Sequence, residues 1–348
     1  MPQAEDVAVI GGAGFIGRHL TARLRHAGCQ VTIISRSAGS GQSEGRQAGD
    51  PGIRYFRATV ADAAKISEAI AGSSVVYDLS MGGGLTWADY ERDFIEGARN
   101  VARAGRQHGV RRLIYTSSIS ALYLGRSGKL READGADRNA GGRNFYARAK
   151  VAAENVLMGL HRSEQLPVVI VRPAIVLGAG GMLAHGALGL AVSSTCILGW
   201  GRGRNPLPCV LARDVAQAMV LAADAPGVDG MAFNLAGDIR PTAEEFVRIL
   251  RERTRRNFRF YPRSLWGMEA SELFLAALKA VVGKAGDRIS YRDLQSLTMA
   301  ADLDCSAARS MLGWTPESDR DAFFREAVDA HLKPIDPGDL RLEPVEAG

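Results

Sequence analysis

A glycine-rich turn between a strand and a helix constrains the fold of this chain more than any other feature. The apolar run Val7–Ile10 leads directly into the segment Gly-Gly-Ala-Gly-Phe-Ile-Gly over residues 11–17, and apolar residues then recur at helical spacing. Such a run is typical of a buried parallel strand. The first glycine permits a tight turn, the third lets a pyrophosphate approach the backbone, and the last lets the helix pack closely on the sheet. At the helix N-terminus, free N–H groups and the helix dipole favour phosphate. The residues predicted to bind a dinucleotide here are Gly11, Gly14, Phe15, Ile16 and Gly17.

Strands and helices alternate along the first two thirds of the chain. Helical patterns at Ala63–Ala71, Tyr90–His108 and Tyr146–Arg162 separate apolar runs. This alternation predicts a doubly wound parallel sheet of the α/β class. The predicted strands are Val7–Ile10, Val31–Ile34, Ile53–Phe56, Val75–Leu79, Leu113–Thr116, Val168–Val171 and Met231–Leu235.

The chain length suits one large α/β unit with a smaller lobe, since there are 348 residues. We predict a Rossmann domain over residues 1–176, with its sheet completed by about 208–240. Residues 177–207 and 241–348 are predicted to form a mainly helical lobe that binds the substrate. Residues 37–52, rich in Gly, Ser and Gln, are predicted to be a surface loop, and Ala187–Gly199 is predicted to be buried.

Composition excludes several classes of protein. The net charge of +5, from 43 basic and 38 acidic residues, is small and spread along the chain, which argues against a nucleic-acid partner. There is no basic segment followed by an apolar one at the N-terminus and no run long enough to span a membrane, so a cytoplasmic protein is expected. The cysteines show no CxxC spacing, which predicts no bound metal, no disulfide framework and a reducing compartment. They are Cys29, Cys196, Cys209 and Cys305.

Two surface features allow more than one interpretation. Arginines are concentrated between Arg251 and Arg259, and they suit either a solvated helix end or a contact with a phosphate or a lipid surface. Leu265–Val282 has the pattern of an amphipathic helix, which suits either a helix packed on the protein or a flap at a membrane surface or lipid substrate.

The end of the second strand indicates the cofactor. An NAD site usually has an acidic residue there for the ribose 2′-hydroxyl, but this chain reads Ile34-Ser35-Arg36. An arginine pairs with a 2′-phosphate instead, and Arg18 adds a second positive charge nearby. We therefore predict NADP as the cofactor, with NAD as the alternative.

A tyrosine and a lysine four residues apart indicate acid-base chemistry. Tyr146 and Lys150 lie on one face of a predicted helix. A tyrosine is a weak acid near pH 7, and a nearby ammonium lowers its pKa toward the working range. We predict that both residues are catalytic and contact the cofactor. Ser118, with Ser117 as the alternative, follows the Leu113–Thr116 strand at the edge where open sheets bind ligands, and its hydroxyl is predicted to hold a substrate oxygen.

These motifs resemble the extended short-chain dehydrogenase/reductase family, also called the NAD-dependent epimerase/dehydratase family, over nearly the whole chain. The resemblance implies that Tyr146, Lys150 and Ser118 are catalytic and that Pro173 contacts the nicotinamide. Ser80, after the fourth strand, is predicted to contact the cofactor too. Further matching positions are Asn100, Glu154, Arg172, Gly178, Asp214 and Leu312–Pro316.

The departures from the family pattern bear on the substrate. An Asp78-Leu-Ser sequence replaces the usual histidine and alanines, and Ile119-Ser120 replaces the Asp-Glu pair of dehydratases. The first hypothesis is an epimerase or ketoreductase of a nucleotide-activated sugar, bound by Arg202 and Arg204, with a contribution from Arg292. The second is an NADP-dependent reductase of a less polar ketone or aldehyde. The third is a non-catalytic cofactor sensor, which an intact Tyr-Lys pair disfavours.

Two further expectations concern a flexible loop and assembly. Gly82, with the two glycines after it, is predicted to approach the substrate closely or to form a moving flap. The family commonly pairs two helices of each subunit in a four-helix bundle, so a homodimer is predicted. The residues expected at that interface are Phe94, Ile95, Ala98, Val101, Val151, Val156 and Leu157.

Overall fold

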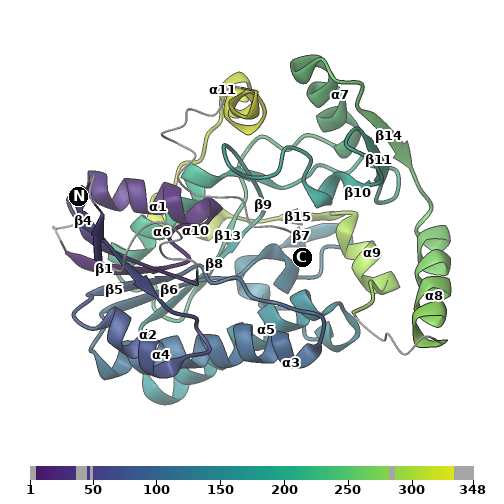
Figure 1. Cartoon of the computed structure of the whole chain (residues 1–348). Coiled ribbons are helices and arrows are strands. Elements are labelled where there is room, and N and C mark those ends of the chain that lie inside the picture. Colours follow the sequence, from purple (N-terminus) through teal and green to yellow (C-terminus); the bar gives the residue numbers. More distant parts are fainter. Residues whose placement is uncertain (1–4, 37–44, 48–49, 282–286, 333–348) are drawn as a thin grey trace.

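A computed structural model describes residues 5–36, 45–47, 50–281 and 287–332, and it is built around a twisted sheet (Figure 1). The strands lie in the order β13-β8-β6-β5-β1-β2-β4-β3, and all neighbours pair in parallel except β3 with β4. Apolar runs form each central strand, as expected for strands covered on both faces. In sheet order the bounds are Ala232–Leu235, Val168–Pro173, Arg112–Thr116, Val75–Asp78, Asp6–Ile10, Gln30–Ser35, Asp50–Arg57 and Gly45–Gln47.

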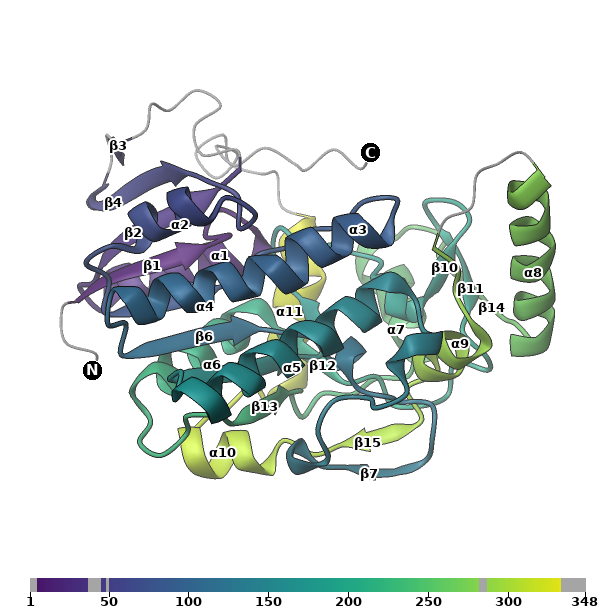
Figure 2. The same cartoon turned by 90° about the horizontal axis from the view of Figure 1, so that it is seen from below.

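Helices cover both faces of this sheet, which confirms the predicted doubly wound α/β class (Figures 1 and 2). On one face α1 (Phe15–His26) packs against α6 (Ala212–Asp224). On the other face α4 (Gly97–Gln107) lies between α2 (Ala63–Ile70) and α5 (Phe145–Glu164). Alternate residues of β1 enter the two cores, because successive side chains of a strand point to opposite faces.

The helix predicted at Tyr90–His108 is formed in three parts. It begins with α3 (Trp87–Tyr90), continues as a π-helical turn over Glu91–Glu96 and ends as α4. Thr86 caps α3, since its hydroxyl and the Asp89 carboxylate bond each other's backbone N–H groups. The predicted start was therefore three residues late, because the capping pair lies before the apolar pattern begins.

The second lobe is formed by the segments between and after the last sheet strands, together with residues 128–130 of the segment that precedes α5. It contains three small sheets, which the prediction of a mainly helical lobe did not include. Strands β9 (Ile175–Leu177) and β12 (Cys209–Leu211) pair in parallel, as do β7 (Gly128–Leu130) and β15 (Ala301–Leu303). The third sheet has the order β10-β11-β14, with bounds Gly189–Ala191, Cys196–Gly199 and Arg259–Pro262. The helices of the lobe are α7 (Ala243–Thr254), α8 (Leu265–Val281), α9 (Tyr291–Leu297), α10 (Ser306–Leu312) and α11 (Arg320–Ala327).

Short 3-10 turns complete the chain. They span Ile119–Ala121, Glu132–Asp134, Ala140–Gly142, Gly186–Leu188 and Asp329–His331.

Two local predictions were wrong. The segment 37–52 was predicted to be a loop, but residues 45–47 and 50–52 belong to β3 and β4, and residues 37–44 and 48–49 lie outside the described residues. Ala187–Gly199 was predicted to be buried, but it forms the hairpin of β10 and β11, and its residues 190–194 are exposed. The apolar composition of this hairpin reflects strand pairing at the surface.

Candidate active site

The glycine turn after β1 has the geometry of a phosphate-binding loop. Gly11 has φ +79°, and a Cβ there would lie 2.7 Å from the carbonyl oxygen of Leu79. A Cβ at Gly17 would overlap the carbonyl oxygen of Gly11, so α1 could not pack this close with any side chain at that position. Gly14 is the N-cap of α1, and no side chain caps this helix end. The first N–H groups of α1, at Phe15 and Ile16, are therefore available to a dinucleotide pyrophosphate, and the turn fits that group.

A second glycine segment lies over this turn, within the residues 177–207 that were predicted to belong to the substrate-binding lobe. A Cβ at Gly181 would lie 2.6 Å from the ring of Phe15, and Gly180 has φ +81°. Arg18 donates from Nη2 to the carbonyl oxygen of Gly180 at 3.3 Å. Arg18 is thus directed to this segment, whereas Arg36 directly follows β2 and is exposed. The crowding of glycines after residue 177 was the signal that could have predicted the contact.

Tyr146, Lys150 and Ser118 come together at the carboxyl edge of the sheet, as predicted. Asn144 caps α5 by accepting a hydrogen bond from the N–H of Ala147, which places Tyr146 in the first turn. The Tyr146 phenol forms a hydrogen bond with the Ser118 side chain. Lys150 is buried one turn further along and donates from Nζ to the carbonyl oxygen of Thr116 at 2.8 Å.

The two candidate serines have different environments. Ser118 is the second residue after the end of β6, and its Oγ also accepts from the N–H of Ser120 at 3.1 Å. The Ser117 Oγ is buried and is among the described side-chain atoms that have no hydrogen-bond partner. Because only Ser118 bonds Tyr146, its hydroxyl is the better placed of the two to share a substrate oxygen with that phenol.

Burial dominates the ionisation of the pair. It raises the pKa of Tyr146, against the hydrogen bond from Ser118, which lowers it. Burial also lowers the pKa of Lys150 to about 8, against the negative charges of Asp78 and Glu154, which raise it. The predicted lowering of the Tyr146 pKa by Lys150 is not seen in this arrangement, in which the Lys150 Nζ lies 6.0 Å from the ring centre and desolvation raises the pKa of the phenol.

Two acidic residues favour the charged form of Lys150. Asp78, at the end of β5, is buried; its Oδ1 accepts from the N–H of Ser80 at 2.9 Å, and its Oδ2 has no partner among the described residues. Glu154 forms a buried double hydrogen bond with Arg172, at 2.9 Å and 2.6 Å. The sequence marked Asp78 only as a departure from the family pattern, whereas the structure makes it a charge that favours the Lys150 ammonium.

A residue of the second lobe fixes the start of the catalytic helix. The buried carboxylate of Asp293, in α9, accepts from the backbone N–H and the side-chain amide of Asn144, both at 2.9 Å. It also accepts from Arg143 at 3.1 Å. Since about 150 residues separate these groups in the chain, no local pattern could have predicted the contact.

The glycine loop that was predicted to approach the substrate packs closely on the helix that follows it. Gly82 and Gly84 lie so close to Asp93 and Asp89 that any Cβ would meet those side chains. Their lack of side chains thus permits packing on the neighbouring helix and gives no support to a substrate contact or a flap.

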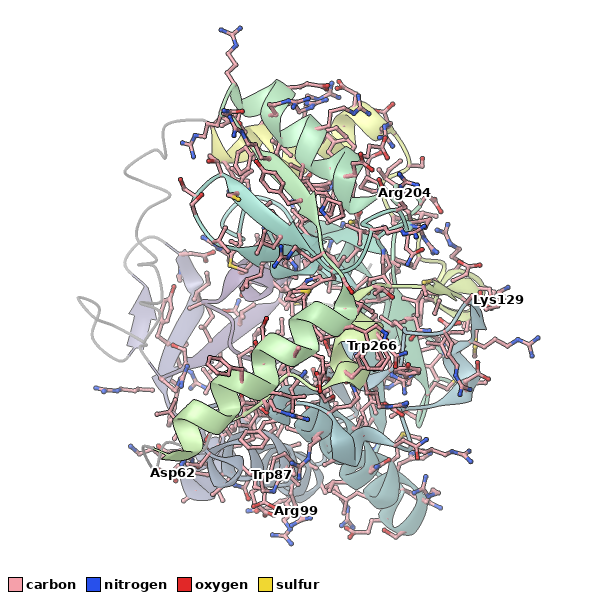
Figure 3. All side chains as sticks on the ribbon, turned by 90° about the vertical axis from the view of Figure 1, so that its right-hand side faces the viewer. Asp62, Trp87, Arg99, Lys129, Arg204 and Trp266 are labelled. Atoms are coloured by element: carbon pink, nitrogen blue, oxygen red, sulfur yellow. The ribbon has the colours of Figure 1, made fainter. Side chains whose placement is uncertain are left out.

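The three candidate arginines also differ. Arg202 and Arg204 are exposed, and Figure 3 shows Arg204 at the outer surface of the second lobe. Arg292 is already paired with Asp137 at 2.7 Å and stacks on Tyr123 at 3.8 Å.

The predicted dimer residues are mostly used within one chain. Ile95 and Val156 are partly buried, and the remaining five are buried in the interior of the described chain. The homodimer stays a prediction, and of the seven residues named for its interface Ile95 and Val156 are the two that a partner could reach in this arrangement. The buried five are Phe94, Ala98, Val101, Val151 and Leu157.

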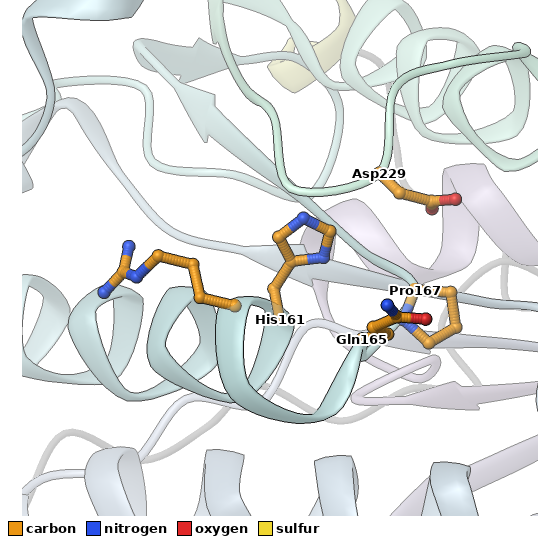
Figure 4. A pocket seen from close by; sticks show the side chains of 5 residues that line it. His161, Gln165, Pro167 and Asp229 are labelled. Atoms are coloured by element: carbon orange, nitrogen blue, oxygen red, sulfur yellow. The ribbon is translucent and has the colours of Figure 1, made fainter.

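A hollow of about 490 Å³ lies away from this chemistry (Figure 4). His161, Gln165 and Asp229 line it, at the end of α5 and before β13. This is the amino edge of the parallel strands, whereas Tyr146 and Ser118 lie at the carboxyl edge, where such sheets bind ligands. Among the described residues no cluster of His, Cys, Asp and Glu is arranged to hold a metal.

Comparison with known proteins decides the family. Residues 7–236 match the model of the NAD dependent epimerase/dehydratase family. The chain belongs to this family. The resemblance inferred from the motifs is thereby confirmed.

Curated relatives match the chain over part of their length. A 2-alkyl-3-oxoalkanoate reductase of Stenotrophomonas maltophilia is 30% identical over 179 residues, which cover 50% of this chain and 52% of the relative. A decarboxylating sterol-4-alpha-carboxylate 3-dehydrogenase of Candida albicans is 27% identical over 235 residues, 63% of this chain and 64% of the relative. The matches therefore span about half to two thirds of these relatives.

Solved structures share the fold. MoeE5 in complex with UDP-glucose and NAD has a TM-score of 0.69 at 22% identity, covering 94% of this chain and 98% of its own. UDP-glucose 4-epimerase from Thermotoga maritima, with UDP-glucose, has a TM-score of 0.67 at 19% identity, covering 94% and 98%. At this level of sequence identity, the structural similarity establishes a shared fold and does not establish a shared function. Within the described ranges, no helix combines the length and apolar character needed to cross a bilayer.

Proposed function

We propose that the chain is an NAD(P)-dependent oxidoreductase that interconverts a secondary alcohol and a ketone on a largely apolar substrate. The observation that carries the proposal is the Tyr146–Ser118 hydrogen bond above a buried Lys150, at the edge of the sheet that also holds the glycine turn. By their names, the two curated relatives described above act on oxoalkanoates and sterols. A sugar nucleotide is less well supported as the substrate. Of the arginines predicted to bind its diphosphate, Arg292 is already paired with Asp137 and Arg204 lies at the outer surface.

Each side chain of the site has a distinct role in this proposal. The nicotinamide cofactor supplies or accepts the hydride when bound. In the direction of reduction, the Tyr146 phenol gives its proton to the carbonyl oxygen, while the Ser118 hydroxyl donates a hydrogen bond to the same oxygen. The Lys150 ammonium stabilises the phenolate that remains and binds ribose hydroxyls. In oxidation the same proton returns to Tyr146.

For the cofactor we infer a preference for NADP. Arg36 directly follows β2, is exposed and has no ion-pair partner among the described residues, so its guanidinium is available for a 2′-phosphate. Arg18 contributes less than the sequence suggested, since it bonds the Gly180 carbonyl. NAD is the alternative, because MoeE5, one of the two solved structures named above, was in complex with NAD.

A nucleotide sugar is the second candidate substrate. Structures with the same fold hold UDP-sugars, and Arg202 and Arg204 are exposed and without ion-pair partners among the described side chains. A diphosphate would pair with such arginines.

A substrate panel separates the two candidates. Purified protein is given NADPH or NADH with a 2-alkyl-3-oxoalkanoate, and NADP⁺ or NAD⁺ with a 3-hydroxysterol or UDP-glucose, and the change in reduced nicotinamide is followed by absorbance. We expect turnover with the apolar substrates, and no competitive inhibition of that turnover by UDP at millimolar concentration. If the protein instead oxidises or epimerises UDP-glucose and does not turn over the apolar substrates, the second candidate is supported.

A further inference from the structure

Helix α8 faces solvent with its apolar side. Trp266 stacks on Tyr291 at 4.7 Å between ring centres but is still 72% exposed, Phe274 is 66% exposed, and Leu273 is also exposed. Trp266, Ala270 and Phe274 are four residues apart and therefore lie along one face of the helix. Glu269 flanks this row, and its side chain is only 13% exposed and pairs with Arg288 at 3.7 Å. This orientation is the reverse of an ordinary surface helix, whose charged face meets water.

The neighbouring small sheet also exposes apolar side chains. Register places Leu190 of β10, Leu198 of β11 and Tyr261 of β14 in one row across the sheet. Leu190 and Tyr261 are exposed, whereas Ile197, which points to the opposite side, is buried. Strand β14 leads directly into α8, and both lie at the same end of the molecule (Figures 1 and 2).

Unpaired positive charge borders this surface. Arg259 in β14 and Arg263 just before α8 are exposed, and neither has an ion-pair partner among the described residues. Arg255 and Arg256, at the turn between α7 and β14, are also exposed and unpaired within the same part of the chain. A hollow of about 580 Å³ between α7 and β14 is lined by Arg251 and Arg259, and also by Glu244 and Glu245. Glu245 is already paired with Arg320, so the border keeps a net positive charge.

We propose that α8 and the β10-β11-β14 sheet bind the surface of an anionic lipid bilayer, with Trp266 and Phe274 entering its interface and Arg259 and Arg263 contacting lipid phosphates. Aromatic side chains with a basic border are the combination that such interfaces stabilise. A second copy of the chain fits less well, because a two-fold contact through this face would bring the same unpaired arginines of both copies together. The proposal goes beyond the oxidoreductase function and does not depend on it.

Co-sedimentation with vesicles tests the proposal on the full chain. The probes are vesicles of phosphatidylcholine alone and vesicles that also contain phosphatidylglycerol. We expect binding to the anionic vesicles, little binding to the neutral ones, and loss of binding at about 1 M salt, where the Debye length is about 3 Å. Replacing Arg259 and Arg263 together by Ala should weaken partitioning by roughly 25-fold, about fivefold for each arginine. Replacing Trp266 and Phe274 together by Ala should weaken it by at least about tenfold.

Matched controls lie on other surfaces. Leu85→Ala removes an exposed apolar side chain, and Arg103→Ala removes an exposed, unpaired arginine of α4. Both should bind vesicles like the wild type. Because all substituted side chains are exposed, an unchanged thermal unfolding midpoint shows that each variant is folded.

Three results would overturn the proposal. One is no binding of the wild type to anionic vesicles. Another is full binding by the Trp266→Ala, Phe274→Ala double variant. The third is a wild-type dimer that this variant converts to monomer with no vesicle binding, which would assign the surface to self-association. Any of these leaves the oxidoreductase proposal standing, since turnover is measured without vesicles.

Discussion

Replacing Glu154 by Gln should strongly destabilise the fold beneath the active site. Glu154 accepts from Nε of Arg172 at 2.9 Å and from Nη2 at 2.6 Å, and both side chains are 3% exposed. A glutamine has one carbonyl oxygen, so one guanidinium N–H would face an amide N–H₂ group, and the arginine charge would stay buried without a counter-charge. Removing one partner of such a pair costs about 3–5 kcal/mol.

The control is the same substitution at the surface. Glu252 pairs with Arg248 at 3.4 Å within α7, and both side chains are 55% exposed. Glu252→Gln should cost less than about 0.5 kcal/mol. The assay is urea unfolding of the three proteins by circular dichroism, with the free energies compared at the wild-type midpoint. A loss of less than about 1 kcal/mol in the free energy of unfolding of Glu154→Gln, with an unchanged dependence on urea concentration, would refute the inference that this buried ion pair is needed for stability.

Three further substitutions test the site. Asp78→Asn removes a negative charge that raises the pKa of Lys150, which is about 8. Because cofactor binding needs the Lys150 ammonium, the affinity for cofactor should begin to fall at a lower pH in this variant than in the wild type. Fluorescence titration of cofactor across pH measures this, and identical pH profiles would contradict it. Arg36→Ala should weaken NADP binding by about 1.5–3 kcal/mol and leave NAD binding nearly unchanged; calorimetric titration of both cofactors measures this, and equal losses would remove the basis for the preference. Gly17→Ala should reduce the affinity for either cofactor at least tenfold, because the new Cβ overlaps the Gly11 carbonyl, whereas Gly159→Ala, where a Cβ meets nothing within 4 Å, should bind normally; equal affinities in the two variants would be inconsistent with the described turn.

The sequence predicted the central sheet well because buried parallel strands are continuous apolar runs. All seven predicted strands exist, and β1, β5 and β6 differ from their predicted bounds by one residue at one end. The edge strand β3 was missed, since a three-residue strand in a polar segment has no apolar pattern. Most of the small strands of the second lobe were missed because three or four residues are too few to show a pattern, even where the strand is largely buried, as β9 is.

The site was predictable where the chemistry is local. The spacing of Tyr146 and Lys150 fixes their relation within one helix, and the glycine turn is contiguous. The contact of Asp293 with Asn144, and the charge of Asp78 below Lys150, arise from tertiary packing that no spacing encodes. The pattern of Leu265–Val282 correctly predicted a helix. It could not reveal that the apolar face points outward, because amphipathicity defines two faces without saying which one meets the protein.

The most direct test of the central claim is hydride transfer by Tyr146→Phe at saturating cofactor and substrate. The variant keeps the ring, which packs edge-on against Phe94 at 5.8 Å, but loses the hydroxyl that bonds Ser118. Tyr123→Phe is the control, since it removes a phenol that bonds Gln295 instead. The account predicts that Tyr146→Phe binds cofactor like the wild type while its turnover falls by about 10²–10⁴-fold, and that Tyr123→Phe keeps its turnover. Wild-type turnover in Tyr146→Phe would contradict the assignment of this phenol as the proton donor.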